Sequence, residues 1–205
     1  MNSAYLPVKR VFDFIATLLG FAFLWPLFAI IAFAIALDSG MPLLYRQERL
    51  TFHEKTFTAL KFRTMVKGAR EIQKKGTPLE KLITRTGAPL RETHFDEFPQ
   101  LWNVLLGEMS LIGPRPLIRE WELQMPKGRL ECKAGMTGLG TVMRLLPHRR
   151  SAILRRLRDA QHLRNENNIY SFDVYYCAHA SARLDFIILC ETFRLVAGKV
   201  AGVFR

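Results

Sequence analysis

The sequence is short of acidic residues relative to its basic ones. It has 18 aspartates and glutamates against 30 lysines and arginines, a formal net charge of +12 over 205 residues. Such a surplus implies an anionic partner, which can be a nucleic acid, an acidic membrane surface or a phosphorylated substrate. Composition does not choose among these, and the length fits one domain with a real core.

Cysteine is also scarce. The chain has only Cys132, Cys177 and Cys190, and no two of them show the CxxC spacing of a metal site or redox motif. An odd, small number of cysteines argues against a disulfide framework of the secreted type. The sequence therefore predicts reduced core thiols in a protein that faces the cytosol.

Charge is absent from one long stretch near the N-terminus, Phe14 to Leu37. This stretch exceeds the ~20 residues that a helix needs to cross a bilayer, so one spanning helix is the simplest interpretation. A cleaved signal peptide fits poorly, because the apolar run is too long and lacks a cleavage site of small residues.

Two features of this stretch favour a re-entrant segment instead. Pro26, which follows Trp25, removes a backbone donor near the middle, so we expect a kink or break that leaves each half ~18 Å long, short of the ~30 Å hydrocarbon core. Basic residues flank the stretch on both sides, which places both flanks in the cytoplasm. A helix-break-helix that enters one leaflet and returns satisfies both facts, whereas a kinked spanning helix satisfies only the first. The flanking basic residues are Lys9, Arg10, Arg46, Arg49, Lys55, Lys61 and Arg63.

The rest of the chain predicts a mainly α fold with a small β-hairpin. Residues 45–65 have strand-like composition on both sides of a polar turn, and the strand period puts Lys61 and Arg63 on one face, where they bind phosphate or are merely solvated. A polar helix is expected over 67–82, broken near 76–78, and a short helix over residues 100–106, before a glycine.

Two further segments, 149–164 and 184–203, are predicted to form basic amphipathic helices. The apolar face of such a helix either packs into the core or lies on an anionic membrane surface as an interfacial helix. The sequence leaves both interpretations open.

An acidic pair, Asp96 and Glu97, marks the start of the short helix. The simple interpretation is structural: Asp96 caps the helix, Glu97 complements its dipole and Pro99 occupies the first turn, where a missing N–H does no harm. A carboxylate beside free helix N–H groups also stays ionised and can act as a nucleophile, and the same helix end attracts phosphate.

Cations and a second carboxylate complete a phosphate site around this pair. Arg91 lies just upstream, and the rigid turn Pro114-Arg115-Pro116 presents a guanidinium that suits bidentate phosphate binding. Glu97 supplies a second oxygen, enough to hold Mg²⁺ together with phosphate oxygens. Together with the membrane segment, these residues predict phosphoryl chemistry on a lipid-borne or lipid-bound substrate.

Four segments follow one another in an order and spacing typical of one family: KRVFDF (Lys9–Phe14), KFRTM (Lys61–Met65), RETHFDEFPQLWNVLLGEMSLIGPRP (Arg91–Pro116) and KAGMTGL (Lys133–Leu139). They resemble the bacterial sugar transferases, monotopic polyprenyl-phosphate phosphoglycosyl transferases that begin exopolysaccharide, O-antigen and glycoprotein glycan assembly. The likeness covers almost the whole chain, in the small form with only the catalytic domain.

The resemblance implies a reaction in two steps. Asp96 would attack the sugar-bearing phosphate of a nucleotide sugar, usually a UDP-sugar, and release UMP; undecaprenyl phosphate would then attack the phospho-Asp96 intermediate. Mg²⁺ would be the cofactor, held by Asp96 and Glu97. The residues expected to bind the substrate phosphates are Lys61, Arg63, Arg91, Pro114, Arg115 and Pro116.

The resemblance also implies where the protein acts. Residues 1–40 would form the membrane-embedded re-entrant segment, with its break at Trp25-Pro26, and residues 41–205 the catalytic part on the cytoplasmic side of the bacterial inner membrane. Anionic membrane lipids are expected partners, a homodimer is an open option, and nucleic acid is not expected, because aromatic and basic residues do not interleave. His94 is expected to be an exposed loop histidine, with proton transfer as the alternative.

Three features depart from the family pattern. Trp25 stands where the family commonly has serine, Ala134 and Thr141 replace the usual proline and glutamine of the PGITG motif, and the hairpin turn at 51–55 lacks the usual glycines. These changes lie away from the acidic pair, so we keep the reaction class and expect them to affect the sugar and the membrane insertion.

Two other functions fit part of the sequence. A basic membrane adaptor would explain the charge but not the acidic pair or the GPRP turn. A membrane phosphatase or pyrophosphatase would use the same site with water as acceptor. Nucleotide turnover excludes the adaptor, and dependence on a lipid acceptor excludes the hydrolase.

Overall fold

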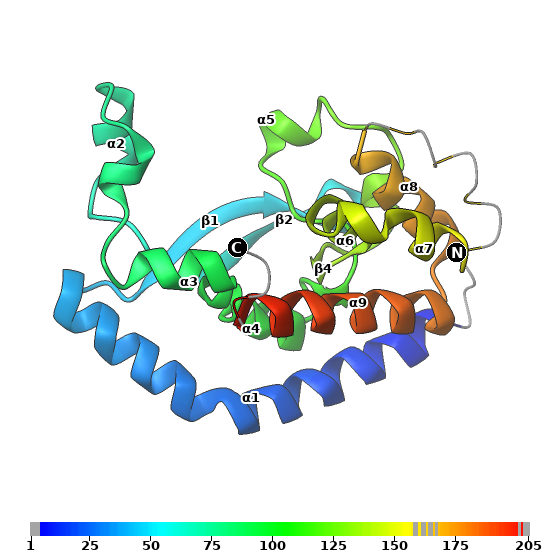
Figure 1. The fold of residues 1–205 in the computed structure, drawn as a ribbon, viewed down its shortest axis with the longest axis horizontal. Coiled ribbons are helices and arrows are strands. Elements are labelled where there is room, and N and C mark those ends of the chain that lie inside the picture. Colours follow the sequence, from blue (N-terminus) through cyan, green and yellow to red (C-terminus); the bar gives the residue numbers. More distant parts are fainter. Residues whose placement is uncertain are drawn as a thin grey trace.

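The structure, a computed structural model, describes residues 5–157, 160, 163, 166, 168–200 and 202. These residues form a mainly helical fold with an antiparallel hairpin, as predicted, and a short parallel strand pair that was not predicted. The elements, labelled in Figure 1, are α1 (Tyr5–Ser39), β1 (Leu44–Leu50), β2 (Thr56–Phe62), α2 (Ala69–Lys74), α3 (Gly87–Thr93), α4 (Gln100–Leu106), β3 (Ser110–Ile112), α5 (Arg119–Glu122), β4 (Gly135–Thr137), α6 (Leu139–Leu145), α7 (Arg150–Leu154), α8 (Tyr170–His179) and α9 (Ala182–Val200).

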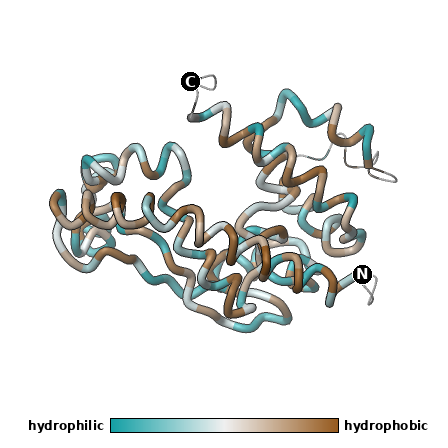
Figure 2. The backbone as a smooth tube through the Cα atoms, turned by 90° about the horizontal axis from the view of Figure 1, so that it is seen from below, coloured by the Kyte–Doolittle hydropathy of each residue, from teal (hydrophilic) through white to brown (hydrophobic). Residues whose placement is uncertain are grey.

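The uncharged stretch belongs to α1, which stays helical through Pro26. Figure 1 shows α1 bent near its middle and lying along one side of the molecule, so the expected break is a bend in a continuous helix. Most of its side chains face outward, and Figure 2 shows the apolar colour along the tube of α1. By length and composition α1 is able to cross a membrane.

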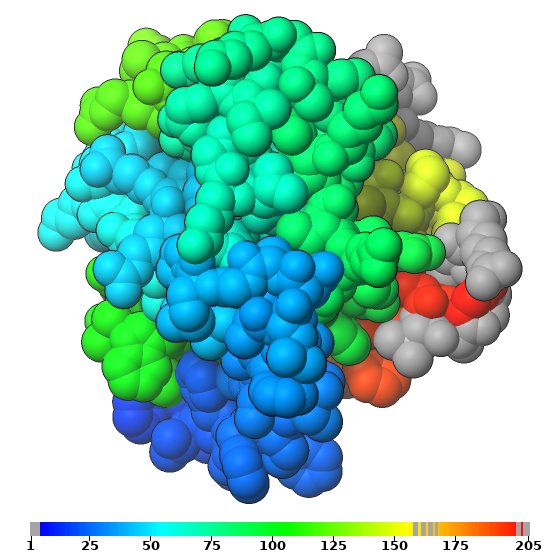
Figure 3. Space-filling view, turned by 90° about the vertical axis from the view of Figure 1, so that its left-hand side faces the viewer, coloured from blue at the N-terminus to red at the C-terminus, as the bar shows by residue number. Residues whose placement is uncertain are grey.

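The second half of α1 and the segment that follows the hairpin appear on the same face of the molecule in Figure 3. Figure 3 shows this half of α1 at the base of one face, with α2 and its flanking turns above it and the hairpin to one side. The predicted helix over 67–82 is shorter than expected: α2 ends at Lys74, and a separate 3-10 turn spans Leu79–Leu82. The expected break near residues 76–78 is confirmed.

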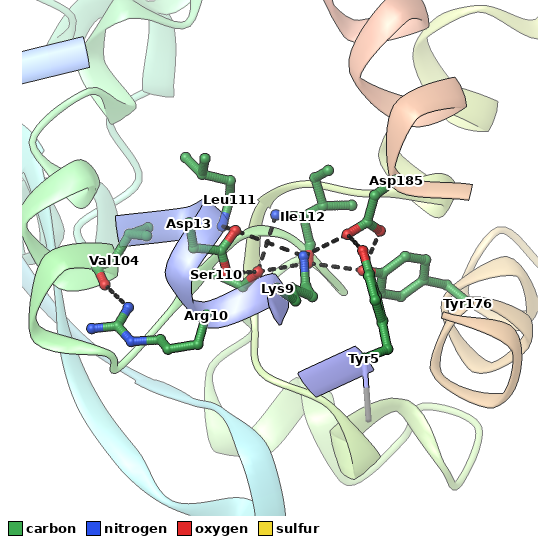
Figure 4. A network of polar contacts seen from close by, with 10 residues as sticks. All are labelled: Tyr5, Lys9, Arg10, Asp13, Val104, Ser110, Leu111, Ile112, Tyr176 and Asp185. Carbon is green, nitrogen blue, oxygen red and sulfur yellow. Dashed lines mark hydrogen bonds and ion pairs between the residues drawn. The ribbon is translucent and has the colours of Figure 1, made fainter. Parts of the chain in front are cut away.

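The first turns of α1 are held against the rest of the chain by a polar network (Figure 4). Lys9 Nζ lies 2.7 Å from Asp185 Oδ2, to which the Tyr5 hydroxyl also donates at 2.6 Å. Asp13 is buried and accepts a 2.6 Å hydrogen bond from the Ser110 hydroxyl. Buried charges are costly unless they are paired, so these contacts fix the helix on this surface.

The C-terminal end of α1 is also held by hydrogen bonds. The Arg63 guanidinium donates to the Ser39 carbonyl at 2.7 Å and the Ser39 hydroxyl at 2.8 Å, and also to the Gly40 carbonyl. Asp38 accepts a 2.7 Å hydrogen bond from the Thr86 N–H. A cation at a helix C-terminus pairs with the free carbonyls of the last turn, so Arg63 serves the end of α1.

The hairpin is confirmed, and α4 is attached to its second strand. Asn103 of α4 is 2% exposed; its amide donates to the Thr58 carbonyl at 2.8 Å and accepts from the Leu60 N–H at 3.2 Å. These bonds satisfy β2 backbone groups that have no strand partner on that side. The predicted helix over 100–106 and its glycine stop are also confirmed, since Gly107 adopts φ 80.

The hairpin turn, which lacks the glycines usual in the family, has two non-glycine residues at positive φ. His53 and Glu54 have φ of 52 and 59, in the left-handed region that costs non-glycine residues energy. The turn therefore holds two non-glycine residues in a conformation that glycine adopts more easily.

The parallel strands β3 and β4 bring the GPRP turn against the KAGMTGL segment. The Gly135 N–H donates to the Pro114 carbonyl at 2.8 Å, and the Gly113 N–H to the Thr137 carbonyl at 2.9 Å. A Cβ on Gly138 would lie 2.0 Å from the Gly113 carbonyl oxygen, far inside van der Waals contact. The glycines of both motifs are therefore required by backbone-to-backbone contact.

The cysteine prediction is wrong for one pair. Cys132 and Cys177 form a disulfide, while Cys190 is free as expected. The partners are 45 residues apart in sequence, and they meet only because α8 packs against the 3-10 turn Arg129–Glu131. Such a contact has no local sequence signal.

The amphipathic segments differ in what their apolar faces touch. The stripe of the segment 149–164 packs into the main core, which confirms the core-facing interpretation. Only Arg150–Leu154 is α-helical among its described residues, and 158–159, 161–162 and 164 lie outside them. In α9, Leu184 and Ile188 join the same core, whereas Phe186 and Phe193 are exposed. The stripe residues in the core are Ile153, Leu154, Leu157 and Ala160.

Gly138→Ala is expected to destabilise the protein by ~1–3 kcal/mol or more, because the new methyl group meets a backbone oxygen that cannot move without breaking the β3–β4 pair. Thermal unfolding in one detergent measures the change. Gly20, in α1, is the matched control: a Cβ there meets nothing within 4 Å, and alanine raises helix propensity. A Gly138→Ala protein as stable as wild type would contradict the close contact.

Candidate active site

The acidic pair lies in a 3-10 turn, Phe95–Glu97, between α3 and α4. His94 ends α3 in the left-handed conformation, with φ 62, and Pro99 directly precedes α4. The expected helix cap is therefore wrong: Asp96 sits a turn before α4 and makes no capping hydrogen bond. The left-handed turn at His94 inserts this extra turn, and a left-handed residue is not visible in a helix pattern.

Glu97 is held by two cations from distant parts of the chain. Lys61 Nζ of β2 lies 2.6 Å from its Oε1, and Arg115 binds both its oxygens, at 2.5 and 3.2 Å. Bidentate arginine pairing is among the strongest hydrogen-bonded arrangements of a carboxylate. Burial tends to raise the pKa of Glu97, but Arg115 and Lys61 outweigh it and lower that pKa to about 2.

Asp96 differs from its neighbour in having no such partner. Within the described part of the chain, its carboxylate takes part in no hydrogen bond and no ion pair. Burial and then the charge of Glu97 raise the pKa of Asp96 to about 6, against the lowering effect of Lys61, Arg91 and Arg115. The expectation that a helix end favours the charged form is therefore wrong, yet Asp96 still ionises below neutral pH with its oxygens unengaged.

The hollow beside Glu97 is lined by more positively than negatively charged side chains. Arg49, Lys61 and Arg115 line it around one carboxylate. Burial and then the nearby Arg115 lower the pKa of Arg49, against the raising effect of Glu97. An anion in the hollow would relieve this repulsion. The other lining residues are Ala59, Gln100, Pro116 and Gly135.

Arg49 is the main residue that sequence reasoning missed, since it counted only as a flanking charge. In the hairpin register Tyr45 pairs with Lys61 and Arg49 with Phe57. Directly paired residues share a face of an antiparallel sheet, and so do residues at a spacing of two. The same strand period that singled out Lys61 could have found Arg49, had it been applied to the first strand as well.

The other predicted site residues are not all brought together. Arg91, in the last turn of α3, lies near enough for its charge to act on Asp96. Arg63 lies at the end of α1 and donates to Ser39 and Gly40, so the structure does not bring it to Glu97 as it brings Lys61.

The two prolines of the GPRP turn act through their backbone carbonyls. Pro114 accepts from the Gly135 N–H at 2.8 Å, and Pro116 accepts from Arg49 Nη1 at 3.4 Å. In α1, Trp25 is 64% exposed on the bent helix that contains Pro26. Among the residues that the structure describes, these four make no side-chain hydrogen bond or ion pair with Asp96 or Glu97.

His94 is not the exposed loop histidine that we expected. It is half-buried, and its Nε2 lies 2.8 Å from Lys199 Nζ at the end of α9. Burial and the Lys199 charge lower its pKa. The residue that turns the chain toward Asp96 is therefore attached to the C-terminal helix.

The acidic pair offers only two of the ligands that a magnesium ion needs. Asp96 and Glu97 offer hard carboxylate oxygens, and no cluster of three or more His, Cys, Asp or Glu occurs among the described residues. Mg²⁺ is commonly held by one or two carboxylates, with water and substrate phosphates as the remaining ligands. The pair therefore fits a metal ion that arrives with a phosphorylated substrate.

Comparison with known proteins identifies relatives over most of the chain. The sugar transferase EpsL of Bacillus subtilis (strain 168), itself uncharacterised, is 36% identical over 92% of this chain and 87% of its own length. The UDP-galactose-lipid carrier transferase of Erwinia amylovora is 34% identical over 92% of this chain, which spans 40% of that protein. The putative undecaprenyl-phosphate N-acetylgalactosaminyl 1-phosphate transferase of Bacillus subtilis is 42% identical over 56% of this chain and 65% of its own length.

The family comparison covers nearly every residue. Residues 4–199 match the family described as bacterial sugar transferase. That range contains the fastened helix α1, the hairpin with Lys61, the acidic pair and the GPRP turn. The chain belongs to the bacterial sugar transferase family.

Proposed function

We propose that this protein transfers a sugar 1-phosphate from a UDP-sugar to undecaprenyl phosphate, the first membrane step in assembling a bacterial surface glycan. The observation that carries the proposal is the unequal treatment of the acidic pair: Lys61 and Arg115 hold Glu97, while Asp96 stays unengaged. The names of the relatives support the substrates, since one acts on UDP-galactose and a lipid carrier and another on undecaprenyl phosphate.

In the first step, a carboxylate oxygen of Asp96 attacks the phosphorus that carries the sugar. The bond from this phosphorus to the bridging oxygen breaks, and UMP leaves with the electron pair. Asp96 then carries the sugar phosphate as an acyl phosphate. Lys61, Arg115 and Arg49 offset the charge on the phosphate oxygens, which is the main contribution a protein makes to phosphoryl transfer.

In the second step, an oxygen of undecaprenyl phosphate attacks the same phosphorus. The bond between Asp96 and phosphorus breaks, which frees the carboxylate and gives the lipid diphosphate sugar. Asp96 and Glu97 would hold Mg²⁺, which when bound neutralises charge on the phosphates. Glu97 also keeps Lys61 and Arg115 aimed at the hollow between the steps.

We infer that α1 is re-entrant and that the site faces the cytoplasmic leaflet of the inner membrane. Its start is fastened through Lys9 and Asp185 and its end through Arg63 and Ser39, so both ends are held by one soluble body. A spanning helix would need its ends on opposite sides of the bilayer. The bent middle, where Phe23 is 88% exposed, offers an apolar surface to lipid.

Purified protein in detergent with Mg²⁺ and a UDP-sugar labelled in the sugar-bearing phosphate is expected to release UMP and retain label on the protein, without lipid acceptor. Asp96→Asn should abolish both signals, because an amide is not a nucleophile here. Asp38→Asn is the matched control: Asp38 is exposed, and an amide oxygen still accepts from the Thr86 N–H.

Each alternative function gives a different result in that experiment. Free sugar phosphate without lipid would indicate a hydrolase, and no nucleotide turnover with any UDP-sugar would indicate an adaptor. Label retained by Asp96→Asn would refute Asp96 as nucleophile.

Chelation of Mg²⁺ by EDTA is expected to stop UMP release, with recovery on adding Mg²⁺ back, since two carboxylates and a diphosphate carry too much negative charge to approach unaided. The assay follows UMP release across a Mg²⁺ titration. Full activity in EDTA would contradict the metal requirement.

The topology of α1 is tested by single cysteines at Ser3, Phe23 and Lys55 in a chain without its native cysteines. A membrane-impermeant maleimide is expected to label positions 3 and 55 from the cytoplasmic side alone, and position 23 from neither side, because Phe23 would lie in lipid. Labelling of positions 3 and 55 from opposite sides would show a spanning helix. Detergent-solubilised protein, labelled at all three positions, is the control for reactivity.

A further inference from the structure

Arg129 is a fully buried cation that lies outside every motif of the site. It is 1% exposed and sits in the 3-10 turn Arg129–Glu131. Its Nη1 lies 2.5 Å from Glu122 Oε2, and its Nε and Nη2 lie 3.2 and 3.0 Å from Asp173 Oδ2. Nη2 also donates to the Arg115 carbonyl at 2.9 Å. One guanidinium therefore joins α5, α8 and the GPRP turn.

The GPRP turn has few other means of being held. Pro114 and Pro116 have no N–H, so their carbonyls are their only backbone hydrogen-bonding groups. Three carbonyls in a row are used: Pro114 accepts from Gly135 N–H, Arg115 from Arg129 Nη2 and Pro116 from Arg49 Nη1. The bond to Arg129 is the one made at Arg115 itself, whose side chain binds Glu97.

The second carboxylate of the cluster extends the support to the neighbouring motif. Asp173 Oδ1 accepts from the Gly140 N–H at 3.2 Å, in the first turn of α6. A Cβ on Gly140 would lie 2.5 Å from that oxygen, so the helix start and the carboxylate are in close contact. Through Asp173, Arg129 fixes the GPRP turn relative to the segment that follows KAGMTGL.

Stability alone does not account for such a cluster. Taking one guanidinium and two carboxylates out of water costs free energy that pairing only partly returns, and apolar residues of similar size often stabilise as well or better. Burial raises the pKa of Asp173 to about 6 even beside Arg129. The cluster provides a hydrogen-bond donor directed at the Arg115 carbonyl oxygen, which apolar packing cannot provide.

We propose that Arg129 is a positioning residue of the active site, which holds the Arg115 carbonyl so that the Arg115 guanidinium meets Glu97 and the substrate phosphate. The inference rests on the proposed function for its catalytic consequence. Lysine does not replace arginine here, because one ammonium cannot reach Glu122, Asp173 and the carbonyl in the planar fork geometry.

The test is a double-mutant cycle on UMP release. Arg129→Lys is expected to lower kcat/KM about tenfold or more, since a small misplacement of a substrate-binding group is costly. In an Arg115→Gln background the same substitution should change kcat/KM by no more than about twofold, because there is no guanidinium left to position. The proposal would be overturned if the losses of kcat/KM from Arg129→Lys and Arg115→Gln multiplied in the double variant, or if Arg129→Lys were fully active.

Arg149→Lys is the matched control for a loss of stability. Arg149 also pairs with a buried carboxylate, Glu191 of α9, at 2.6 and 3.1 Å, and in the part of the chain that the structure describes neither residue is hydrogen-bonded to the GPRP turn or to the acidic pair. It is expected to change thermal unfolding and leave UMP release as it is. Should Arg129→Lys fail to fold, Glu122→Gln enters the same cycle, because it weakens the cluster and leaves Arg129 in place.

Hydrogen exchange separates this inference from the proposed function. The amides of Gly113, Arg115 and Leu117 are expected to exchange faster in Arg129→Lys than in wild type, and no faster in Arg149→Lys. If wild type releases no UMP, the proposed function fails while the exchange result still decides whether Arg129 holds the turn. Unchanged amide exchange in Arg129→Lys would show that Arg129 does not hold the GPRP turn.

Discussion

The ion pairs of Glu97 with Lys61 and Arg115 are the contact on which the rest of the site depends. They join the second strand of the hairpin, the turn after α3 and the GPRP turn, which are far apart in sequence. They also separate two neighbouring carboxylates: cations lower the pKa of Glu97 to about 2, while burial and Glu97 itself raise that of Asp96 to about 6. Pairs of acids whose pKa values are driven apart by their surroundings are the usual basis for a division of chemical roles.

The parts of this arrangement that follow from the sequence are those with a local cause. The hairpin, the short helix α4 and its glycine stop are recognisable because a strand period of two and a glycine at the helix end act over a few residues. The sequence also singles out Lys61 and Arg115 as cations of the site, but as phosphate ligands; their pairing with Glu97 is seen only in the structure. The bend of α1 is also local, since Pro26 removes a single backbone hydrogen bond and the helix continues past it.

The parts that do not follow depend on partners set by tertiary structure. Arg63 has the same strand parity as Lys61, but β2 ends at Phe62 and the free carbonyls of α1 take its guanidinium. Asp96 looks like a helix cap because the left-handed turn at His94 has no signature in a non-glycine residue. Cys177 meets Cys132 only through the packing of α8, and Arg129 finds its carboxylates in two different helices. The disulfide and the Arg129–Asp173 pair span 45 and 44 residues, over which no sequence pattern extends, whereas the turn at His94 is local but carries no residue-type signal.

Two of the departures from the family pattern, Ala134 and the hairpin turn, are connected by one hydrogen bond. Ala134, in place of the usual proline, has an N–H, which donates to the Thr51 hydroxyl at 3.1 Å; that hydroxyl donates in turn to the Glu108 carbonyl at 3.0 Å. Proline at 134 would have no N–H to donate, and Thr51 begins the hairpin turn that lacks the usual glycines. The Ala134 carbonyl meanwhile accepts from the Ser110 N–H at 2.8 Å, in the pairing of β3 with β4. The bond between Ala134 and Thr51 therefore couples the altered turn to the strands that support Arg115, so two changes that look separate in sequence act at one place and leave the acidic pair untouched.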